Sequence, residues 1–571
     1  MENSNGGNIL NRWSGKPYSV EILEKRKKLA IWQHKDQFLN AFRANQVLAL
    51  VAQTGSGKST QIAQFVLEDM NIYKSNITIA CSQPQKVAVM STSHRVAEEM
   101  GVTIGEQVGY RTKFEDCTSS TTVFKYVQDD MLLKEAMADP LLQRYKVIII
   151  DDIQERALAT DVLLGYLTTI LTKRLDLKLV FMSSTSLESE KFKNYFQKHY
   201  PSIHIMKVPG RLHRVEIVYT SDEEVDSNNY LDAVTKTVVN IHRYEPLGDV
   251  LVFLSEEGEV EDACNKISKE ICNLKNLVDP TKLVPLYSCL PATMQHKIFE
   301  ACSGRKIVVT TNIVEYSLSM DGISYVVDSG FVKKNVFDNK LRMESLVTST
   351  ISKASANMRS EHASRSTSDG RRGKCFRLYT EESFNNNFDL ETCPEIWRLN
   401  LSNMILSFWK LDVYDFLCFG YVDFPDVENL VCAFEELAYL GAFDRDCKIT
   451  NIGEVMSVFP LEPRMSKMLV VSPEFNCSQE ILSISSMLSV PNCFVGSREE
   501  QKEVKVKFHS IHGDHLTFLN IYRAYKQNNE DLSWCNDNFI SYWTLKEADN
   551  IRQELEYIMM EESNIVANFL S

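Results

Sequence analysis

A glycine-rich segment near the start of the chain has the residue types and spacing that bind a triphosphate. The segment AQTGSGKSTQIAQFV (52–66) follows the apolar run VLALV (47–51). Glycines let backbone N–H groups approach phosphate oxygens, a lysine neutralises their charge, and a serine hydroxyl can ligate Mg²⁺ at a helix N-terminus. The residues expected to bind nucleotide here are Gly55, Ser56, Gly57, Lys58, Ser59 and Thr60. The segment predicts a P-loop that binds ATP with Mg²⁺, although Ala52 replaces the usual first glycine. A glycine- and serine-rich turn with a chance lysine is the alternative.

The segment IIIDDIQERALATD (148–161) supplies a second set of chemical groups. Its apolar run ends in Asp151 and Asp152, which indicates a buried strand that delivers two carboxylates to the C-terminal edge of a parallel sheet. Ligands of α/β proteins bind at this edge. The pair is therefore a candidate for the catalytic acids of an ATP-driven motor, and the residues alone leave open whether it still hydrolyses ATP.

Apolar runs separated by helix-length segments extend through the first two thirds of the chain. They predict strands at 47–51, 77–82, 146–150, 177–182, 249–254, 282–288, 305–311 and 323–328. Strands that alternate with helices indicate parallel α/β sheets, and a change of pattern near 208–220 separates two such units. After about Thr380 apolar residues recur at helical spacing, as in 544–562, so the rest of the chain is predicted to be mostly helical.

Length and composition restrict the class of protein. A chain of 571 residues allows roughly three to five domains. No apolar run approaches the roughly 18 residues that span a bilayer, and the N-terminus lacks the layout of a signal peptide, so no membrane association is expected. The 14 cysteines form no C-x-x-C pair that would suggest zinc or a redox dithiol. With a net charge of −14, nucleic-acid binding would require a local basic surface.

The ordered motifs of the chain resemble those of the DEAH-box RNA helicases. They are AQTGSGKSTQIAQ, SQPQKVAVMSTSHRVAEEM (82–100), DDIQERALATD, MSSTSLESEKF (182–192), VPGRLHRVEI, TNIVEYSLSMDG (311–322) and ISKASANMRSEHASR (351–365). Two later segments, 473–495 and 512–531, resemble the helical accessory region of that family. The similarity covers nearly the whole chain and extends to the branch that disassembles spliceosomes and acts in ribosome biogenesis.

The resemblance implies a fold and an order of domains. The expected fold is α/β, with two tandem RecA-like parallel-sheet domains that hold ATP between them, followed by a winged helix and a helical ratchet. The expected ranges are 1–35 for an N-terminal extension, 36–208 and 209–386 for the RecA-like domains, 387–455 for the winged helix and 456–571 for the ratchet-like bundle. Since the chain stops at Ser571, near where an OB-fold would begin, we expect that domain to be missing and the docking of G-patch activators to be lost with it.

The resemblance also assigns roles in binding and hydrolysing ATP. Ser59 and Asp151 would hold Mg²⁺. Asp152 stands where the family has the glutamate that deprotonates the attacking water, and Gln154 stands in place of the histidine of DEAH. The nucleotide-binding residues expected outside the P-loop are Arg95 and Phe299, which would enclose the adenine, and Ser317, Ser319 and Asp321, which would face the nucleotide from the second domain.

The segment MRSEHASR (358–365) corresponds to the QRxGRxGR element of the family. Met358 replaces a glutamine beside the attacking water, His362 stands at the position of one arginine finger, and Arg365 remains as the other finger. An arginine finger contributes roughly 10³–10⁵ in rate, and a reacting group displaced by about 1 Å can cost on the order of 10²-fold. We therefore expect weakened hydrolysis, with Asp152, Gln154, His362 and Arg365 as the candidate catalytic residues. An ordinary loop histidine is the alternative interpretation of His362.

Members of this family contact the RNA backbone independently of base sequence. Lys86 and Thr311 are the expected RNA contacts, Arg305 is interpreted as a solvated charge beside a strand, and Gln85 and Asp130 replace family residues in a way that should weaken binding. The chain is thus predicted to be a nuclear, and also cytoplasmic, ATP-dependent helicase that binds single-stranded RNA in pre-mRNA splicing or other RNA processing. Spliceosomal or ribosome-assembly proteins are its expected partners. The alternative is a pseudo-helicase that binds nucleotide or partner proteins without efficient hydrolysis or unwinding.

Overall fold

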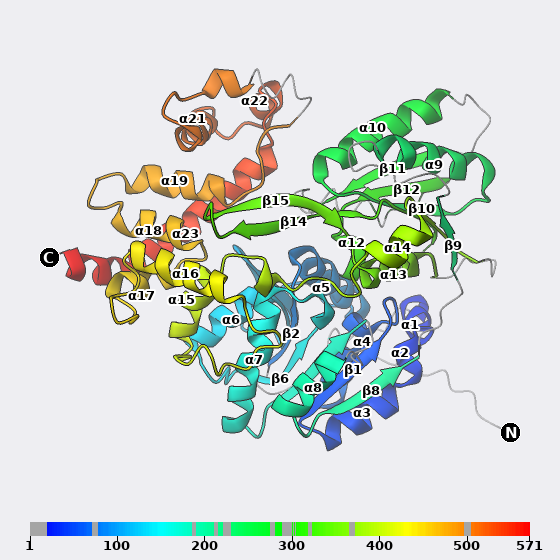
Figure 1. Cartoon of the computed structure of the whole chain (residues 1–571), viewed down its shortest axis with the longest axis horizontal. Helices are drawn as coiled ribbons and strands as arrows, with labels where there is room; N and C mark the ends of the chain where they lie inside the picture. Colours follow the sequence, from blue (N-terminus) through cyan, green and yellow to red (C-terminus); the bar gives the residue numbers. More distant parts are fainter. Residues whose placement is uncertain are drawn as a thin grey trace. The chain divides into compact units, whose positions relative to one another are not determined.

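The computed structural model describes residues 20–70, 78–184, 190–209, 215–220, 230–273, 280–287, 290, 298, 300, 302, 304–317, 322–364, 372–495 and 504–570. The chain divides into two compact units. The first consists of Met1–Leu399 and Leu417–Pro425, and the second of Asn400–Phe416 and Asp426–Ser571. Figure 1 shows that the first unit contains the sheets, whereas the second is built from helices.

The first sheet is parallel except for one edge strand. Among the described residues its strand order is β4-β3-β5-β2-β6-β7-β1-β8, and β4 runs antiparallel to β3. The strands are β1 (Val47–Ala52), β2 (Thr78–Gln83), β3 (Val108–Thr112), β4 (Glu115–Cys117), β5 (Phe124–Gln128), β6 (Tyr145–Ile150), β7 (Lys178–Ser183) and β8 (His204–Val208). The central strands β1, β2, β6 and β7 are buried over nearly their whole length, which explains their continuous apolar sequences.

Helices follow most strands of this sheet, as expected for parallel strands joined by crossovers. They are α4 (Lys58–Asp69), α5 (Lys86–Met100), α6 (Asp129–Ala138), α7 (Leu158–Lys173) and α8 (Glu190–His199), with a short 3₁₀ turn η2 (Ile153–Glu155) after β6. Helices α4 and α5 contribute Ile62, Phe65, Val89 and Val96 to the same apolar core as β1 and β2. This packing fixes the N-terminal ends of the two helices relative to the C-terminal edge of the sheet.

The residues before β1 belong in part to this first domain. They form α1 (Val20–Lys27), α2 (Ala30–Gln33) and α3 (Lys35–Ala44). Ala30, Ile31 and Phe38 lie in the core of the domain, and Arg26 is buried. The sequence placed residues 1–35 in an extension, but α2 buries Ala30 and Ile31 in the core of the domain and α1 buries Arg26 beside it.

The second sheet is parallel throughout its described strands, in the order β11-β12-β10-β13-β16-β9. The strands are β9 (Glu216–Tyr219), β10 (Asp249–Phe253), β11 (Thr281–Leu286), β12 (Arg305–Thr310), β13 (Ile323–Asp328) and β16 (Lys374–Arg377). The accompanying helices are α9 (Tyr230–Tyr244), α10 (Glu257–Asn273), α12 (Val314–Ser317), α13 (Lys353–Glu361), α14 (Glu381–Asn387) and the turns η4 (His362–Ser364) and η5 (Glu395–Trp397). Two tandem parallel sheets confirm the predicted α/β class.

An antiparallel hairpin is inserted between β13 and β16. It consists of β14 (Phe331–Asp338) and β15 (Met343–Thr350), drawn in Figure 1 as a long two-stranded ribbon. Strand β15 is exposed over nearly its whole length, and Leu346 is 66% exposed. The sequence analysis did not predict this hairpin, because a strand without a buried face lacks the alternation of apolar and polar residues that reveals strands.

The eight predicted strands are all present, as β1, β2, β6, β7, β10, β11, β12 and β13. The interpretation of Arg305 as a solvated charge is wrong. Its side chain is 2% exposed, and its guanidinium donates to the carbonyls of Ile241 at 2.6 Å and Glu245 at 2.9 Å. Arg305 therefore satisfies carbonyl groups at the C-terminal end of α9 and is buried among them.

The second unit is helical, as the sequence predicted. Its helices are α15 (Ser402–Lys410), α16 (Val427–Tyr439), α17 (Asn451–Val458), α18 (Pro463–Val471), α19 (Ser478–Leu488), α21 (Asp514–Gln527), α22 (Leu532–Asp537) and α23 (Tyr542–Leu570). The predicted apolar stripe of α23 is buried at Leu545, Ala548, Ile551 and Leu555. Among the helices of the described chain, none is both long and apolar enough to span a bilayer.

The segment Leu417–Pro425 belongs to the first unit although it follows α15 in the chain. The hydroxyl of Tyr195 on α8 donates to the carbonyl of Gly420 at 3.2 Å. Gly165 on α7 has no room for a side chain, because a Cβ there would overlap the ring of Phe419 and lie 2.8 Å from the carbonyl oxygen of Gly420. Because of this close approach, a substitution of Gly165 tests whether the segment Leu417–Pro425 packs on α7.

We expect Gly165→Ala to destabilise the protein by about 1–3 kcal/mol, the usual cost of overpacking. Elsewhere in a helix the same change stabilises by up to about 1 kcal/mol, because alanine has the higher helix propensity. Gly258→Ala in α10 is the matched control, since no described atom lies within 4 Å of its added Cβ. The two variants are compared by chemical denaturation. Equal stability of both would show that Leu417–Pro425 does not pack on α7 in solution.

Candidate nucleotide-binding and catalytic site

The P-loop has the backbone geometry of an anion-binding turn. Gly55 and Gly57 have φ angles of 78° and 91°, which favour glycine because a Cβ would be strained there. Gly57 is the N-cap of α4, and no side chain caps this helix end. The first N–H groups of α4 are therefore left for a ligand, and the helix dipole favours an anion there.

The two functional residues after Gly57 meet the carboxylate pair that follows β6. Nζ of Lys58 lies 3.1 Å from Oδ1 of Asp152, and both side chains are buried. The Ser59 side chain lies close enough to Asp151 to act toward lowering the pKa of that carboxyl. The strands β1 and β6 are separated only by β7 in the sheet, so their C-terminal ends bring these groups to one edge. The structure thus brings together the residues predicted for phosphate and Mg²⁺ binding.

Asp151 is held in a polar but buried position. Nε2 of Gln83, at the end of the neighbouring strand β2, donates to its Oδ2 at 3.1 Å, and the N–H of Asp152 donates to its Oδ1 at 2.9 Å. Burial and the adjacent Asp152 carboxylate raise the pKa of Asp151 to about 6, although Lys58 acts in the opposite direction. A buried carboxylate that lacks sufficient positive charge is a reasonable ligand for a divalent cation.

Gln154 connects the carboxylate pair to the strand β7. Its Nε2 donates to Oδ1 of Asp152 at 3.0 Å, and its Oε1 accepts from the N–H of Ser184 at 3.1 Å. An amide can make both contacts at once because it has a donor and an acceptor on one rigid group. The uncharged Gln154 side chain therefore links the Asp152 carboxylate to the residue that follows β7.

Arg156 closes the loop that begins at Asp151, here called the acidic loop (151–156). Its guanidinium is buried between Asp161, with contacts at 2.8 and 3.0 Å, and Asp423, at 2.5 Å. Glu395 adds two contacts: its N–H donates to the carbonyl of Arg156 at 3.1 Å, and its carboxylate accepts from the N–H of Leu158 at 2.9 Å. Segments far along the chain thus hold the acidic loop in place.

Other polar residues at this edge were not recognised as site residues from the sequence. The hydroxyls of Ser82 and Thr160 donate to Asp129, and burial raises the pKa of that carboxyl to about 7. Gln85, interpreted from sequence as a lost RNA contact, donates to Glu155 at 3.1 Å, and burial raises the pKa of Glu155 well above its usual range. Their position in the sequence could have revealed them, because they follow or end the strands β2, β5 and β6, which are neighbours and end at the same edge of the sheet.

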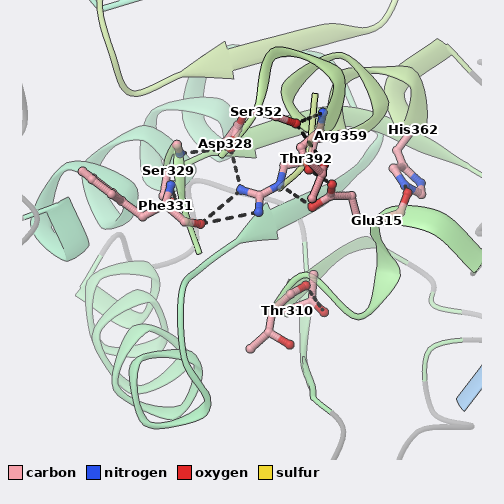
Figure 2. Close-up of polar contacts among 12 residues, drawn as sticks. Thr310, Glu315, Asp328, Ser329, Phe331, Ser352, Arg359, His362 and Thr392 are labelled. Atoms are coloured by element: carbon pink, nitrogen blue, oxygen red, sulfur yellow. Dashed lines mark hydrogen bonds and ion pairs between the residues drawn. The ribbon is translucent and has the colours of Figure 1, made fainter. Parts of the chain in front are cut away.

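A buried arginine organises the corresponding edge of the second domain (Figure 2). The guanidinium of Arg359 on α13 donates to Glu315 at 3.1 Å and to Asp328 at 2.8 Å, and it lies 4.8 Å from the ring centroid of Phe253. The hydroxyl of Ser355 also donates to Glu315. These contacts bind α13, which carries the MRSEHASR segment, to α12 and β13.

His362 lies inside this domain. Its side chain is 1% exposed, Nε2 lies 3.3 Å from the carbonyl oxygen of Glu315, and the ring is 5.9 Å from that of Phe253 (Figure 2). Met358 is buried as well. His362 begins the turn η4 and packs at the end of α13, so the alternative of an ordinary, non-catalytic histidine stays open. Its predicted catalytic role stays a prediction that this enclosed position does not favour.

Some of the other predicted residues lie in the described part of the chain, and the rest lie outside it. Arg95 on α5 pairs with Glu98 at 3.1 Å and with Glu99 at 2.9 Å, and Lys86 is the first residue of α5. The carbonyl of the largely buried Thr311 accepts from the hydroxyl of Thr310 at 3.1 Å, and Ser317 is the last residue of α12. The residues that lie outside the described part of the chain are Phe299, Ser319, Asp321 and Arg365.

Three stretches of the chain match models of known domain families. Residues 42–189 match the AAA domain, residues 433–461 the winged-helix part of the helicase associated domain (HA2), and residues 462–518 its ratchet-like part. Together with the P-loop geometry, these matches define a P-loop NTPase, a class that binds a nucleoside triphosphate with Mg²⁺. An AAA domain followed by both HA2 domains is the arrangement of the DEAH/RHA-type helicases, so the three matches support a helicase of this type. That helicase family implies a nucleic-acid substrate.

The residues at this edge fit Mg²⁺ with a triphosphate, and the pKa of Asp151 sets the pH range in which they can bind it. A carboxyl with a pKa of about 6 is protonated below that pH and then cannot ligate a cation. We expect Mg²⁺ to strengthen ATP binding at pH 7.5 and to lose this effect as the pH falls below 6. Fluorescence titration with and without EDTA measures the difference.

Asp151→Asn is the control for this pH dependence. ATP itself takes up a proton at mildly acidic pH, and the variant reports that contribution because it lacks the titrating carboxyl. The Mg²⁺ effect should be small and nearly independent of pH in Asp151→Asn. A wild-type protein whose Mg²⁺ effect persists unchanged to pH 5 would contradict the assignment of Asp151 as the cation ligand.

Proposed function

We propose that this protein is an ATP-dependent RNA helicase of the DEAH-box class with weakened hydrolysis, which acts in pre-mRNA splicing or other RNA processing in the nucleus. The observation that carries the proposal is the continuous set of contacts from Lys58 through Asp152 and Gln154 to Ser184. It joins the phosphate-binding lysine to the candidate general base and to the end of β7. A nucleotide-binding site without a motor function would not need the last of these links.

In the proposed reaction, Lys58 exchanges its contact with Asp152 for the phosphates of ATP. Asp152 then becomes able to accept a proton from a water molecule that attacks the γ-phosphorus, while the bond from that phosphorus to the β–γ bridging oxygen breaks and ADP leaves. Mg²⁺ held by Ser59 and Asp151 would neutralise charge on the phosphate oxygens. Gln154 keeps the Asp152 carboxylate oriented and couples its position to Ser184. In this protein an aspartate does the work of a longer glutamate, so the attacking water must lie closer to the strand edge.

The second domain supports the expectation of weak hydrolysis. The γ-phosphate accumulates charge in the transition state, and arginine side chains normally offset that charge. At the position of one such arginine, His362 is enclosed against Glu315 and Phe253. This observation also favours the second candidate function, a pseudo-helicase that binds nucleotide or partner proteins without efficient hydrolysis. Arg365 is the remaining candidate for a catalytic arginine.

The proposed substrate is single-stranded RNA bound through its backbone, without base specificity. Lys86 at the start of α5 and Thr311 after β12 are the proposed contacts. Burial raises the pKa of Asp130, and one of its carboxylate oxygens has no hydrogen-bond partner among the described residues. A buried acidic side chain of this kind carries no positive charge that would attract a phosphate. We propose weak RNA binding that spliceosomal or ribosome-assembly proteins would reinforce.

An RNA-stimulated ATPase assay on the purified protein tests the helicase function. We expect slow turnover that increases with single-stranded RNA and disappears in Lys58→Ala, because the variant lacks the cation that binds the β- and γ-phosphates. Lys25→Ala is the matched control, since Lys25 is exposed and its ammonium pairs with Glu21 on its own helix, away from the P-loop residues. Nucleotide binding without any turnover would favour the pseudo-helicase. Turnover that persists in Lys58→Ala would exclude this site as its source.

A triple substitution tests why hydrolysis is weak. We expect Asp152→Glu, Met358→Gln and His362→Arg together to raise kcat far more than any one of them, because catalytic groups that act as a unit are not additive. Steady-state ATP hydrolysis at saturating RNA gives the comparison. The buried site of His362 makes the single change His362→Arg a useful control for folding, checked by thermal unfolding. A folded triple variant without any gain would place the defect elsewhere in the chain.

A further inference from the structure

One buried carboxylate connects the proposed base-binding residue on α5 to the helix α4 that follows the P-loop. Glu99 lies on α5 and is 4% exposed. Its Oε1 accepts from Nε of Arg95 at 2.9 Å, whereas its Oε2 accepts from Nε2 of both Gln61 and Gln64 at 2.8 Å. Gln61 and Gln64 lie on α4, directly after Lys58 and Ser59. The two oxygens thus divide their contacts between the proposed base-binding arginine and the helix that carries the phosphate-binding residues.

Arg26 provides the buried positive charge beside this carboxylate. Its side chain is 2% exposed, and its Nε donates to Oε1 of Gln61 at 2.8 Å and lies 3.6 Å from Oε2 of Glu99. The guanidinium carbon lies 5.0 Å from the ring centroid of Trp32. The Nη2 group is buried and has no hydrogen-bond partner among the described residues. A buried arginine that is incompletely satisfied costs stability, so packing alone does not explain its presence.

The same N-terminal segment also contacts the P-loop directly. The N–H of Ile31 donates to the carbonyl of Ser56 at 3.1 Å. Cδ1 of Leu29 lies 2.8 Å from the point where a Cβ on Gly57 would be. The P-loop is therefore enclosed on one side by α2 and the residue before it, while Arg26 anchors the first turns of α4 through Gln61.

We propose that Glu99 and Arg26 are positioning residues of the nucleotide site. Glu99 holds Arg95 in register with α4, so that base and triphosphate are bound at a fixed separation, and Arg26 fixes α4 to the N-terminal helices. The inference rests on the proposed function, because it assigns Arg95 to the base. Preorganised groups bind more tightly since less conformational freedom is lost on binding.

A purely structural cross-link makes a different prediction from a positioning role. Glu99→Gln keeps a side-chain carbonyl that can accept from Gln61 and Gln64. The variant has no negative charge, so Arg95 loses its charged acceptor. A positioning role therefore predicts weaker binding of ATP with little change for tripolyphosphate, which has no base. A general loosening of the fold would weaken both ligands alike.

The experiment measures displacement of a fluorescent ATP analogue by ATP and by tripolyphosphate, each with Mg²⁺. We expect Glu99→Gln to weaken ATP binding about tenfold, the value of one lost charge-assisted hydrogen bond, and tripolyphosphate binding by less than about twofold. Glu98→Gln is the matched control, because Glu98 also pairs with Arg95 but is exposed, and its carboxylate has no hydrogen bond to α4 within the described part of the chain. It should leave both affinities within about twofold.

A double-mutant cycle sharpens the test. If Glu99 acts through Arg95, the loss of ATP affinity in Glu99→Gln should not add to that in Arg95→Ala. Additive losses, equal losses for both ligands, or no loss at all in Glu99→Gln would overturn the assignment. A wild-type protein that binds tripolyphosphate and ATP equally would remove the base contact from the proposed function and this inference with it.

Arg26→Lys keeps the proposal testable if Glu99→Gln does not fold. The variant retains a cation near Glu99 but lacks the guanidinium that donates to Gln61. Since it disturbs the anchor of α4 and leaves the Arg95 contact in place, ATP and tripolyphosphate should weaken by the same factor, about threefold, while thermal unfolding stays equal to wild type. A general loosening of the fold would lower the unfolding temperature as well and would overturn the role of Arg26. Unchanged affinity for both ligands, with thermal unfolding equal to wild type, would overturn the role of Arg26.

Discussion

The arrangement of the first domain depends on the buried ion pair between Lys58 and Asp152. Neither charge is tolerated alone inside a protein, so the P-loop and the acidic loop must approach one another for either to be buried. Every other contact at this edge follows from that constraint. Asp151 is left short of positive charge, Gln154 holds the oxygen of Asp152 that Lys58 also contacts, and the first N–H groups of α4 are left for a ligand.

The second domain also buries charged side chains, but there one arginine is paired with two carboxylates. There, Arg359 is surrounded by Glu315 and Asp328, so the positive charge is shared between carboxylates on α12 and β13. Glu315 then offers its carbonyl to His362. The imidazole is thereby part of the internal packing of the second domain.

Segments remote from the sheets complete both halves of the first site. The N-terminal helices contact the P-loop through Ile31 and α4 through Arg26, whereas Asp423 and Glu395 hold Arg156 at the end of the acidic loop. Buried arginines make these links because a guanidinium can satisfy several acceptors in fixed directions. The catalytic edge is therefore shaped from outside the sheet as much as by the strands that end there.

The sequence by itself determined the α/β class, the eight central strands, the helical second unit and the P-loop, because buried parallel strands and phosphate-binding turns need particular residue types at fixed local spacings. Tertiary structure decided what those spacings cannot encode. Glu99 binds Gln61 and Gln64 on another helix, and Arg156 binds Asp423, so these contacts join residues distant in the chain. The burial of His362 and Arg305 likewise depends on how the second domain packs. The hairpin β14–β15 also escaped prediction, since β15 has no buried face and its residues carry no periodic signal.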